Sequence, residues 1–93
     1  MTTEQKITGE EMIEMLGDGP RVRVVVSRYH EGQIVSPSIL ARYAGRKNYR
    51  VVAGWYDASD QCTYLCGAVN GTRDECEAWL REQGFRAPDI GAV

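Results

Sequence analysis

The sequence predicts an α+β domain in which an antiparallel sheet of three to four strands packs on two helices, with a short third helix. Two observations carry this prediction. Two segments begin with the T-x-x-E spacing of a helix capping box, and β-branched and aromatic residues dominate the segments between them. The 93 residues fit one domain, and 43% hydrophobic with 26% charged residues is typical of a globular protein. We expect helices to cover one face of the sheet and the other face to be exposed.

The first helix is predicted over Gly9–Leu16. Thr8 and Glu11 have the capping-box spacing, in which each side chain accepts a hydrogen bond from a backbone amide that the first helical turn leaves unpaired. Gly17 suits the left-handed position that ends a helix. The apolar residues between these two signals form one face, so this helix should pack on the sheet.

The second helix is predicted over Arg73–Gln83. Its capping box is formed by Thr72 and Glu75, and Gly84 follows its last turn. Phe85 is then placed to contact the last helical turn, as in a Schellman motif. The segment therefore has both a start and a stop signal.

Strands are predicted between the helices. Valines alternate with basic and polar residues over Arg21–Tyr29, which predicts a strand with one basic face. A tight turn around Gly32 would let Gln33–Val35 pair back on this strand. Tyr49–Tyr56 and Gln61–Val69 flank a polar turn and predict a second hairpin.

Two segments are less regular. Ser36 as N-cap, Pro37 in the first helical turn and Gly45 at the end favour a short helix over residues 36–45, whereas a strand there would need its proline at a sheet edge. Residues 86–93 contain a proline and a glycine and show no periodicity, so we expect a loose tail.

The net charge of −2 conceals an uneven distribution. Residues 1–19 carry one cation and five acids, residues 20–50 carry seven cations and one acid, and residues 51–93 carry three cations and seven acids. In one interpretation, acidic helices lie near a basic sheet and partly neutralise it. In the other, the middle third forms a cationic surface for a phosphate backbone or an acidic protein.

The chemistry-bearing residues do not form a recognisable active site. Cys62, Cys66 and Cys76 are odd in number, which favours reduced thiols in an intracellular protein. The chain has no apolar run long enough for a membrane span or a secretory signal, so we expect a soluble, cytoplasmic protein. Two cysteines four residues apart on a strand would be roughly 13 Å apart, too far for one metal ion. His30 falls on a turn, and no cofactor is expected.

The second half of the chain resembles a known module. The strand Tyr49–Asp57, the following turn and strand, and the helix within Gly71–Leu80 are similar to the β-β-β-α, arm-type or AP2-like DNA-binding domain of tyrosine recombinases. That resemblance implies DNA contacts from lysines and arginines on the second strand, but Gln61–Leu65 occupies this position here. In size, charge layout and architecture, the chain also resembles phage accessory proteins, including anti-CRISPR inhibitors.

These observations predict a non-catalytic binding protein, a phage-type inhibitor or adaptor that occludes an acidic or nucleoprotein partner. Arginine together with tyrosine is typical of interface hot spots and of nucleic-acid platforms. The alternative is a nucleic-acid-binding sheet that contacts phosphates, and a third hypothesis is a small enzyme that uses one of the cysteines. The predicted partner-binding residues are Arg21, Arg23, Tyr29, Arg42, Arg46, Lys47, Arg50 and Tyr56.

Overall fold

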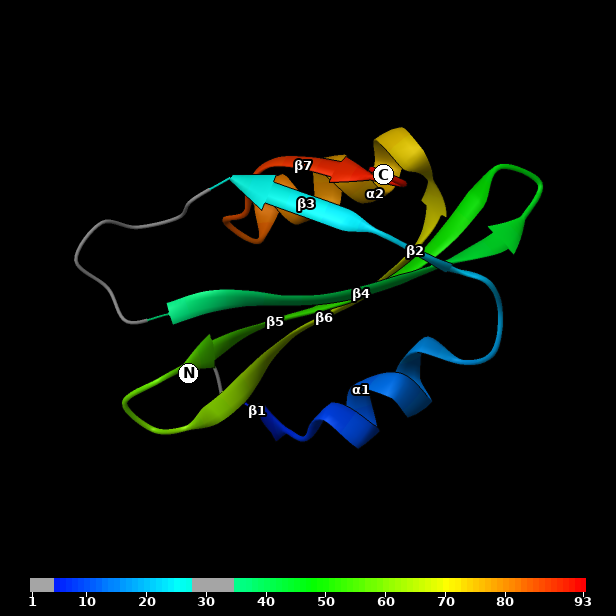
Figure 1. The fold of residues 1–93 in the computed structure, drawn as a ribbon. Coiled ribbons are helices and arrows are strands. Elements are labelled where there is room, and N and C mark those ends of the chain that lie inside the picture. The colour runs from blue at the N-terminus through cyan, green and yellow to red at the C-terminus, as the bar shows by residue number, and fades with distance from the viewer. Residues whose placement is uncertain (1–4, 28–34) are drawn as a thin grey trace.

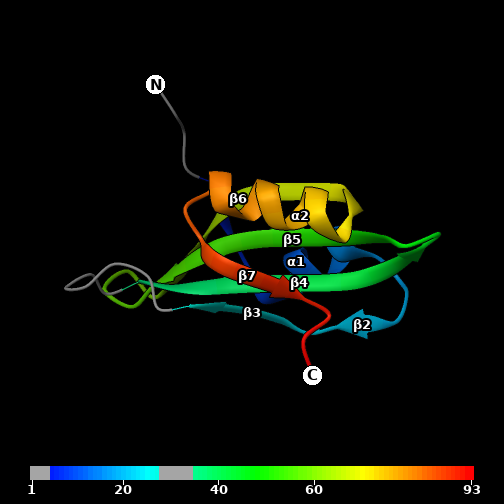
Figure 2. The same ribbon diagram turned by 90° about the horizontal axis from the view of Figure 1, so that it is seen from above.

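The computed structural model describes residues 5–27 and 35–93, which form three layers (Figures 1 and 2). The middle layer is a five-stranded antiparallel sheet with the strand order β1-β6-β5-β4-β2. Helix α1 lies on one face of this sheet, and helix α2 lies on the other face together with the two-stranded ribbon of β3 and β7. The predicted α+β class with two helices and antiparallel strands is confirmed.

The elements have the following bounds in chain order: β1 Gln5–Ile7, α1 Gly9–Leu16, β2 Arg21–Val22, β3 Val24–Ser27, β4 Val35–Gly45, β5 Asn48–Asp57, β6 Cys62–Thr72, α2 Arg73–Glu82 and β7 Arg86–Ile90.

Both helices begin and end where their local signals place them. The Thr8 hydroxyl accepts a bond from the Glu11 amide at 3.1 Å, and the Glu11 carboxylate accepts one from the Thr8 amide at 3.0 Å. The same reciprocal pair starts α2. At the end of α2 the Phe85 amide donates to the Leu80 carbonyl at 3.1 Å, which completes the predicted Schellman motif.

The expectation of one exposed sheet face is wrong, because both faces of the sheet are covered. Val51 and Ala53 pack in the core cluster that contains Leu80 of α2, whereas Val52 packs in a second cluster with Leu16 of α1. These three consecutive strand residues are fully buried, which is the pattern of a strand covered on both sides. The sheet also has more strands than predicted, because flanking segments add to its edges.

Two further expectations are corrected. Residues 36–45 form strand β4, not a helix, because β5 pairs with this segment from Val35 to Gly45 and outweighs the local helix-start signals. The predicted loose tail is wrong for residues 86–90, which form β7 and pair with β3, so that Ile90 is completely buried. Ser27 also fixes this ribbon, because its hydroxyl donates to the Arg86 carbonyl at 3.1 Å.

The predicted strand over residues 21–29 divides in two. Its first part, β2, pairs with β4 in the central sheet, and its second part, β3, leaves this sheet to pair with β7. The turn predicted around Gly32 and the residues expected to pair back through position 34 lie outside the described residues. Neither of the two described helices has the length and hydropathy required to cross a membrane.

Candidate functional site

The connection between β4 and β5 consists of two basic residues in an unusual backbone conformation. Arg46 has φ of 54° and Lys47 has φ of 62°. Two-residue hairpins with positive φ at both central positions are type I′ turns, for which Asn-Gly is strongly preferred. A side chain with a β-carbon costs about 1–2 kcal/mol in the left-handed region. Both residues are exposed, so burial of their side chains does not offset this cost.

Two tyrosines support this turn from the adjoining strands. The rings of Tyr43 and Tyr49 meet edge to face, with centroids 5.7 Å apart. The Tyr43 hydroxyl accepts a hydrogen bond from the Lys47 amide at 3.3 Å. The Tyr43 side chain remains 39% exposed, so an aromatic surface lies directly beside the two cations.

Three arginines stand next to one another on the α1 face of the sheet. The strand register pairs Arg21 of β2 with Arg42 of β4, and Arg42 with Arg50 of β5. We call these three residues the arginine row. Directly opposite residues in antiparallel strands have Cα atoms about 4.5–5.5 Å apart, and like charges at this spacing destabilise a sheet. A compensating interaction is therefore required.

The end of α1 supplies this compensation. Arg42 donates its Nε–H to the Leu16 carbonyl, and Arg50 donates to the Met15 carbonyl from Nε at 3.1 Å and from Nη2 at 2.9 Å. The last carbonyls of a helix lack partners and carry a partial negative charge, and α1 has no basic residue of its own in its last turn. Two of the predicted partner contacts thus hold α1 on the sheet.

The loop after α1 passes directly over Arg42. A β-carbon added at Gly19 would lie 3.2 Å from the Arg42 Cδ atom, and one at Gly17, where φ is 81°, would lie 3.4 Å from its Nη2 atom. The glycines therefore allow the close approach that brings the arginine to the helix end. Sequence reasoning interpreted Gly17 as a helix stop but did not find this second role.

Acidic side chains do not neutralise the basic middle third among the described residues. The described ion pairs both involve Arg73, with Glu77 at 3.1 Å and with Asp89 at 2.5 Å. Burial opposes ionisation of Glu77, but the Ile90 amide and Arg73 outweigh it and hold the pKa of this carboxyl below its usual value. Glu77 and Asp89 thus pair within the last third of the chain, and no cation of the basic segment that the structure describes has a carboxylate partner.

The remaining predicted residues lie at different places. Arg23 is exposed between β2 and β3, where its carbonyl accepts a bond from the Gly91 amide at 2.7 Å. Tyr56 is exposed at the far end of β5, nine residues from Lys47 and therefore roughly 30 Å away along the strand. Tyr29 lies outside the described residues. The eight predicted residues therefore do not form one patch.

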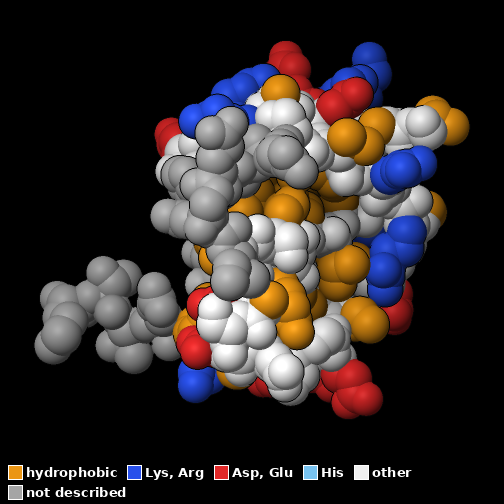
Figure 3. Space-filling model, turned by 60° about the vertical axis from the view of Figure 1, so that its left-hand side comes forward, with side chains coloured by type: hydrophobic (Ala, Val, Ile, Leu, Met, Phe, Trp, Pro, Cys, Tyr) orange, Lys and Arg blue, Asp and Glu red, His pale blue; other side chains and the backbone are white. Residues whose placement is uncertain are grey.

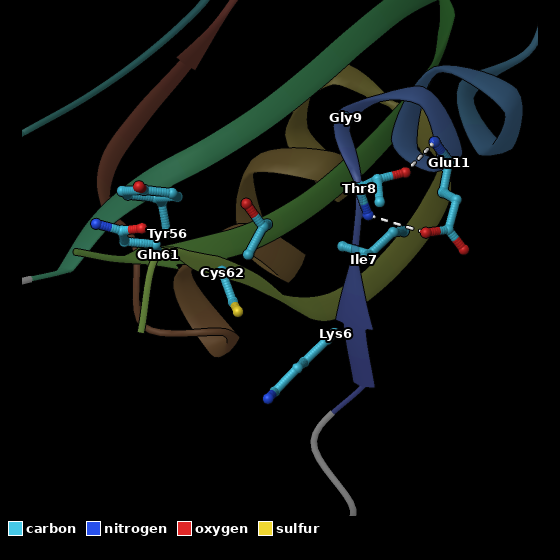
Figure 4. A pocket seen from close by; sticks show the side chains of 9 residues that line it. Lys6, Ile7, Thr8, Gly9, Glu11, Tyr56, Gln61 and Cys62 are labelled. Atoms are coloured by element: carbon cyan, nitrogen blue, oxygen red, sulfur yellow. Dashed lines mark hydrogen bonds between the residues drawn. The ribbon is translucent and has the colours of Figure 1, made fainter. Parts of the chain in front are cut away.

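Tyr56 instead lines a pocket of about 340 Å³ at the start of α1 (Figure 4). Lys6 and Thr8 line it from one side, and Gln61 and Cys62 line it from the β5–β6 turn. The Thr8 and Glu11 amides beside it are already bonded within the capping box, so this helix start offers no free amides from that pair.

Two of the three thiols, Cys66 and Cys76, do not have the lowered pKa of a catalytic nucleophile. Burial raises the pKa of Cys66, and burial followed by the adjacent Glu75 and Glu77 raises the pKa of Cys76, so both are protonated at neutral pH. All three cysteines are free. Within residues 5–27 and 35–93, no three histidine, cysteine or acidic side chains gather in a way that could hold a metal ion.

Basic and acidic side chains are mixed on part of the surface. On the side shown in Figure 3, hydrophobic side chains gather in the centre and side chains of both charges lie around them. The β4–β5 turn differs, because two adjacent cations form its entire connection.

Comparisons with family models, curated proteins and solved structures find no match for this chain.

Proposed function

We propose that this protein is a non-catalytic binding protein that recognises an acidic or nucleoprotein surface through the end of the sheet that carries the β4–β5 turn. We call this end, formed by Arg21, Tyr43, Arg46 and Lys47, the basic end. Pro20 accepts a hydrogen bond from the Tyr43 amide, which places β2 and Arg21 beside the last residues of β4. The four exposed residues thus lie at neighbouring backbone positions at one end of the sheet, with Arg21 on the α1 face and Tyr43, which meets Tyr49, on the α2 face.

The conformation of Arg46 and Lys47 carries this proposal. Asparagine and glycine would form the same turn at a lower conformational cost. Two cations in left-handed conformations have no stabilising role that the described contacts account for, and such unfavourable backbone positions concentrate at functional sites. Their side chains have no acceptor among the described residues, so their charges remain available to a partner.

The mechanism that fits this arrangement is steric occlusion by an inhibitor or adaptor. The turn lies at the end of long paired strands, β4 and β5, that continue into the buried core. Cations on such a rigid support lose little conformational freedom of the backbone on binding. Tyr43 adds an aromatic contact of the kind that dominates interface energies. The bulk of the two helical layers would then cover the partner surface.

Affinity capture from a bacterial lysate tests this proposal. The variant Arg46→Glu/Lys47→Glu reverses both charges of the turn, and Arg81→Glu/Arg86→Glu makes the same charge change at two exposed arginines elsewhere. We expect the turn variant to lose a partner that the wild-type protein and the control variant both retain. Equal recovery of every partner by all three folded proteins would overturn the proposal.

A further inference from the structure

We infer that the outer edge of β6 is a docking site for an extended segment of a partner protein, which adds to the central sheet as a further strand. This site uses none of the residues of the basic end, so it is independent of the proposed function. Strand β5 pairs with β6 from Cys62 to Thr72, whereas β1 pairs with it only from Thr63 to Leu65. No described residue therefore pairs with the outer side of residues 66–72, and we call this segment the open edge.

The backbone groups of the open edge face outward at two positions. Cys76 Sγ donates to the carbonyls of Tyr49 and Gly71 at 3.7 and 3.5 Å, and these two residues are opposite each other in the register, so both carbonyls point between β5 and β6. Successive residues of a strand direct their polar groups to opposite sides. The N–H and C=O groups of Ala68 and Asn70 thus point away from β5, and no described residue bonds to them.

The open edge lacks the features that protect the other edges of the sheet. Natural edge strands are short or carry charged residues or proline. Strand β1 has three residues with Lys6 among them, β2 has two with Arg21 among them, and β4 carries Pro37 on the stretch that β2 leaves unpaired. Residues 61–72, by contrast, form the longest uncharged run of the chain. The bulge in β6 lies before Gly67, so six regularly paired residues follow it and provide a template for a further strand.

Helix α2 lies over β6 and leaves an apolar surface at the open edge (Figure 2). The Trp79 ring covers Gly67, because a β-carbon at Gly67 would lie 3.3 Å from the Cζ2 atom of the ring. Trp79 and Val69 pack on the core beneath α2 but stay partly exposed, whereas Val51, with strands on both sides, is fully buried. An added strand would bury this surface in the same way. The side chains that face α2 from such a strand should therefore include an apolar residue at the level of Trp79.

The charges beside Trp79 specify the flanking residues of the partner segment. Glu75 and Glu82 precede and follow Trp79 by four and three positions, so the three side chains share one side of α2. Both glutamates are exposed, and the described ion pairs include neither of them. They lie about 6 and 4.5 Å from Trp79 along the helix axis, and alternate residues of a strand lie about 6.6 Å apart. The partner segment thus carries an apolar residue with a basic residue two positions before it and two positions after it.

A second copy of this chain does not fit the same edge. Antiparallel pairing of two identical β6 strands relates the copies by a two-fold axis perpendicular to the sheet, which places both α2 helices on the same face. Glu75 and Glu82 of the two copies would then face each other, and like charges across an interface are unfavourable. The geometry thus favours a strand that carries basic residues and has no helix of its own on this face.

Fluorescence anisotropy with a labelled seven-residue peptide tests the inference. The peptide has a central valine, a lysine two positions away on each side and threonine elsewhere, and a second peptide has glutamates in place of the lysines. We expect saturable binding of the lysine peptide by the wild-type protein and about tenfold weaker binding of the glutamate peptide. Equal affinity for the two peptides, or no binding of the lysine peptide, would overturn the inference.

Two pairs of variants test whether the peptide lies on the open edge. Ala68→Pro removes an outward N–H and places a ring in the path of an added strand, whereas Ala68→Ser keeps the N–H. The proline variant should bind the lysine peptide about tenfold more weakly, and the serine variant should bind it like wild type. Glu82→Lys should remove the preference for the lysine peptide, whereas Glu14→Lys, the same charge change on α1, should preserve it. Wild-type affinity in folded Ala68→Pro, or an unchanged preference in Glu82→Lys, contradicts the inference.

Hydrogen exchange identifies the backbone bonds. With the lysine peptide bound, the amides of Ala68 and Asn70 should exchange more slowly than in the free protein, by about tenfold or more. Unchanged exchange at both amides would place the peptide elsewhere and overturn the inference. A wild-type dimer in sedimentation equilibrium that Ala68→Pro dissociates would also overturn it, because a second copy would then occupy the edge. Arg46→Glu/Lys47→Glu should bind the peptide like wild type, which separates this site from the proposed function.

Discussion

The two ends of β5 carry opposite charges and use them differently. At the β5–β6 turn, the Asp57 carboxylate accepts a bond from the Ser59 amide at 2.9 Å, and Asp60 accepts one from the Tyr64 hydroxyl. At the β4–β5 turn, the side chains of Arg46 and Lys47 have no acceptor among the described residues. The acidic turn uses its carboxylates to stabilise its own conformation, whereas the cations of the basic turn make no such internal bond among the described residues. The candidate site is therefore distinguished by cations that have no internal acceptor among the described residues, and not by its charge alone.

Helix α1 connects these two ends. Its start lies near the acidic turn, where the pocket between them is lined by Thr8 and Gln61, and its last carbonyls face the arginine row. Acidic residues at its start and arginines at its end both oppose the partial charges of the helix termini. The start is stabilised by neighbours in sequence and the end by side chains from distant strands. Variants at each terminus therefore measure local and long-range contributions separately.

The largest effect on stability is expected at the arginine end of α1. Arg42→Ala/Arg50→Ala removes every side-chain donor described on the Met15 and Leu16 carbonyls, which should cost about 2–4 kcal/mol of unfolding free energy. Thr8→Ala should cost about 1 kcal/mol by removing the cap at the other terminus. Urea denaturation measures both. Arg21→Ala, in the same row but without an internal bond, is the control. The comparison fails if the double variant is no less stable than this control.

The next expected effect is a gain in stability. Arg46→Asn/Lys47→Gly places the preferred residues in the type I′ turn and should raise the unfolding free energy by about 1–2 kcal/mol. The same variant should lose partner capture, because it removes both cations. Arg46→Ala/Lys47→Ala is matched to it, since it removes the charges but keeps β-carbons in left-handed conformations. It should lose capture without the gain in stability. Equal stability of the two variants in urea would contradict the assignment of strain to this turn.

A smaller gain is expected at the acidic turn. Gln61 has φ of 57°, so Gln61→Gly should raise the unfolding free energy by about 0.5–1 kcal/mol in urea denaturation. Capture should be unchanged, because this turn lies at the other end of β5. Gln61→Ala keeps a β-carbon and serves as the control. A loss of capture in the glycine variant would show that partner binding is not confined to the basic end.

Local signals predicted the two helices but not strands β4 and β7. The capping boxes at Thr8 and Thr72 each join two residues that are three positions apart, so a short window of the sequence contains both partners of each hydrogen bond. By contrast, Ser36 and Pro37 give a helix-start signal that pairing with β5 overrides. Ile90 is buried only because β7 meets β3, which lies some sixty residues earlier in the chain. Such pairings depend on tertiary packing that no short window of sequence reveals.

The sequence predicted which segment is rich in cations, but it did not predict the interactions that each cation makes. The excess of cations in the middle third identified the segment that forms the basic end. The sequence did not show that Arg42 and Arg50 bond to helix carbonyls. One signal was present, since α1 has acidic residues in its first turn and no basic residue in its last, and such a helix requires cations from elsewhere. That signal indicates that cations are required at the end of α1, but it does not indicate which strand provides them.

The smallest effect concerns the titration of one phenol at the acidic end. The hydrogen bond to Asp60, followed by burial and the nearby negative charges, raises the pKa of Tyr64 to about 12. Asp60→Asn should lower this pKa toward the ordinary tyrosine value of about 10. Because the folded pKa is the higher one, the bond should stabilise the turn fully below about pH 10 and lose this contribution as the pH rises toward 12.

Tyrosinate absorbance, with Tyr64→Phe to identify the signal, measures this shift. Arg46→Asn/Lys47→Gly should leave the Tyr64 titration unchanged, because the acidic turn is stabilised by its own side chains. A wild-type Tyr64 that titrates at the ordinary value would contradict the bond to Asp60. The Asp60 carboxylate would then lack its side-chain donor, and the contrast between the two ends of β5 would rest on the bond between Asp57 and the Ser59 amide alone.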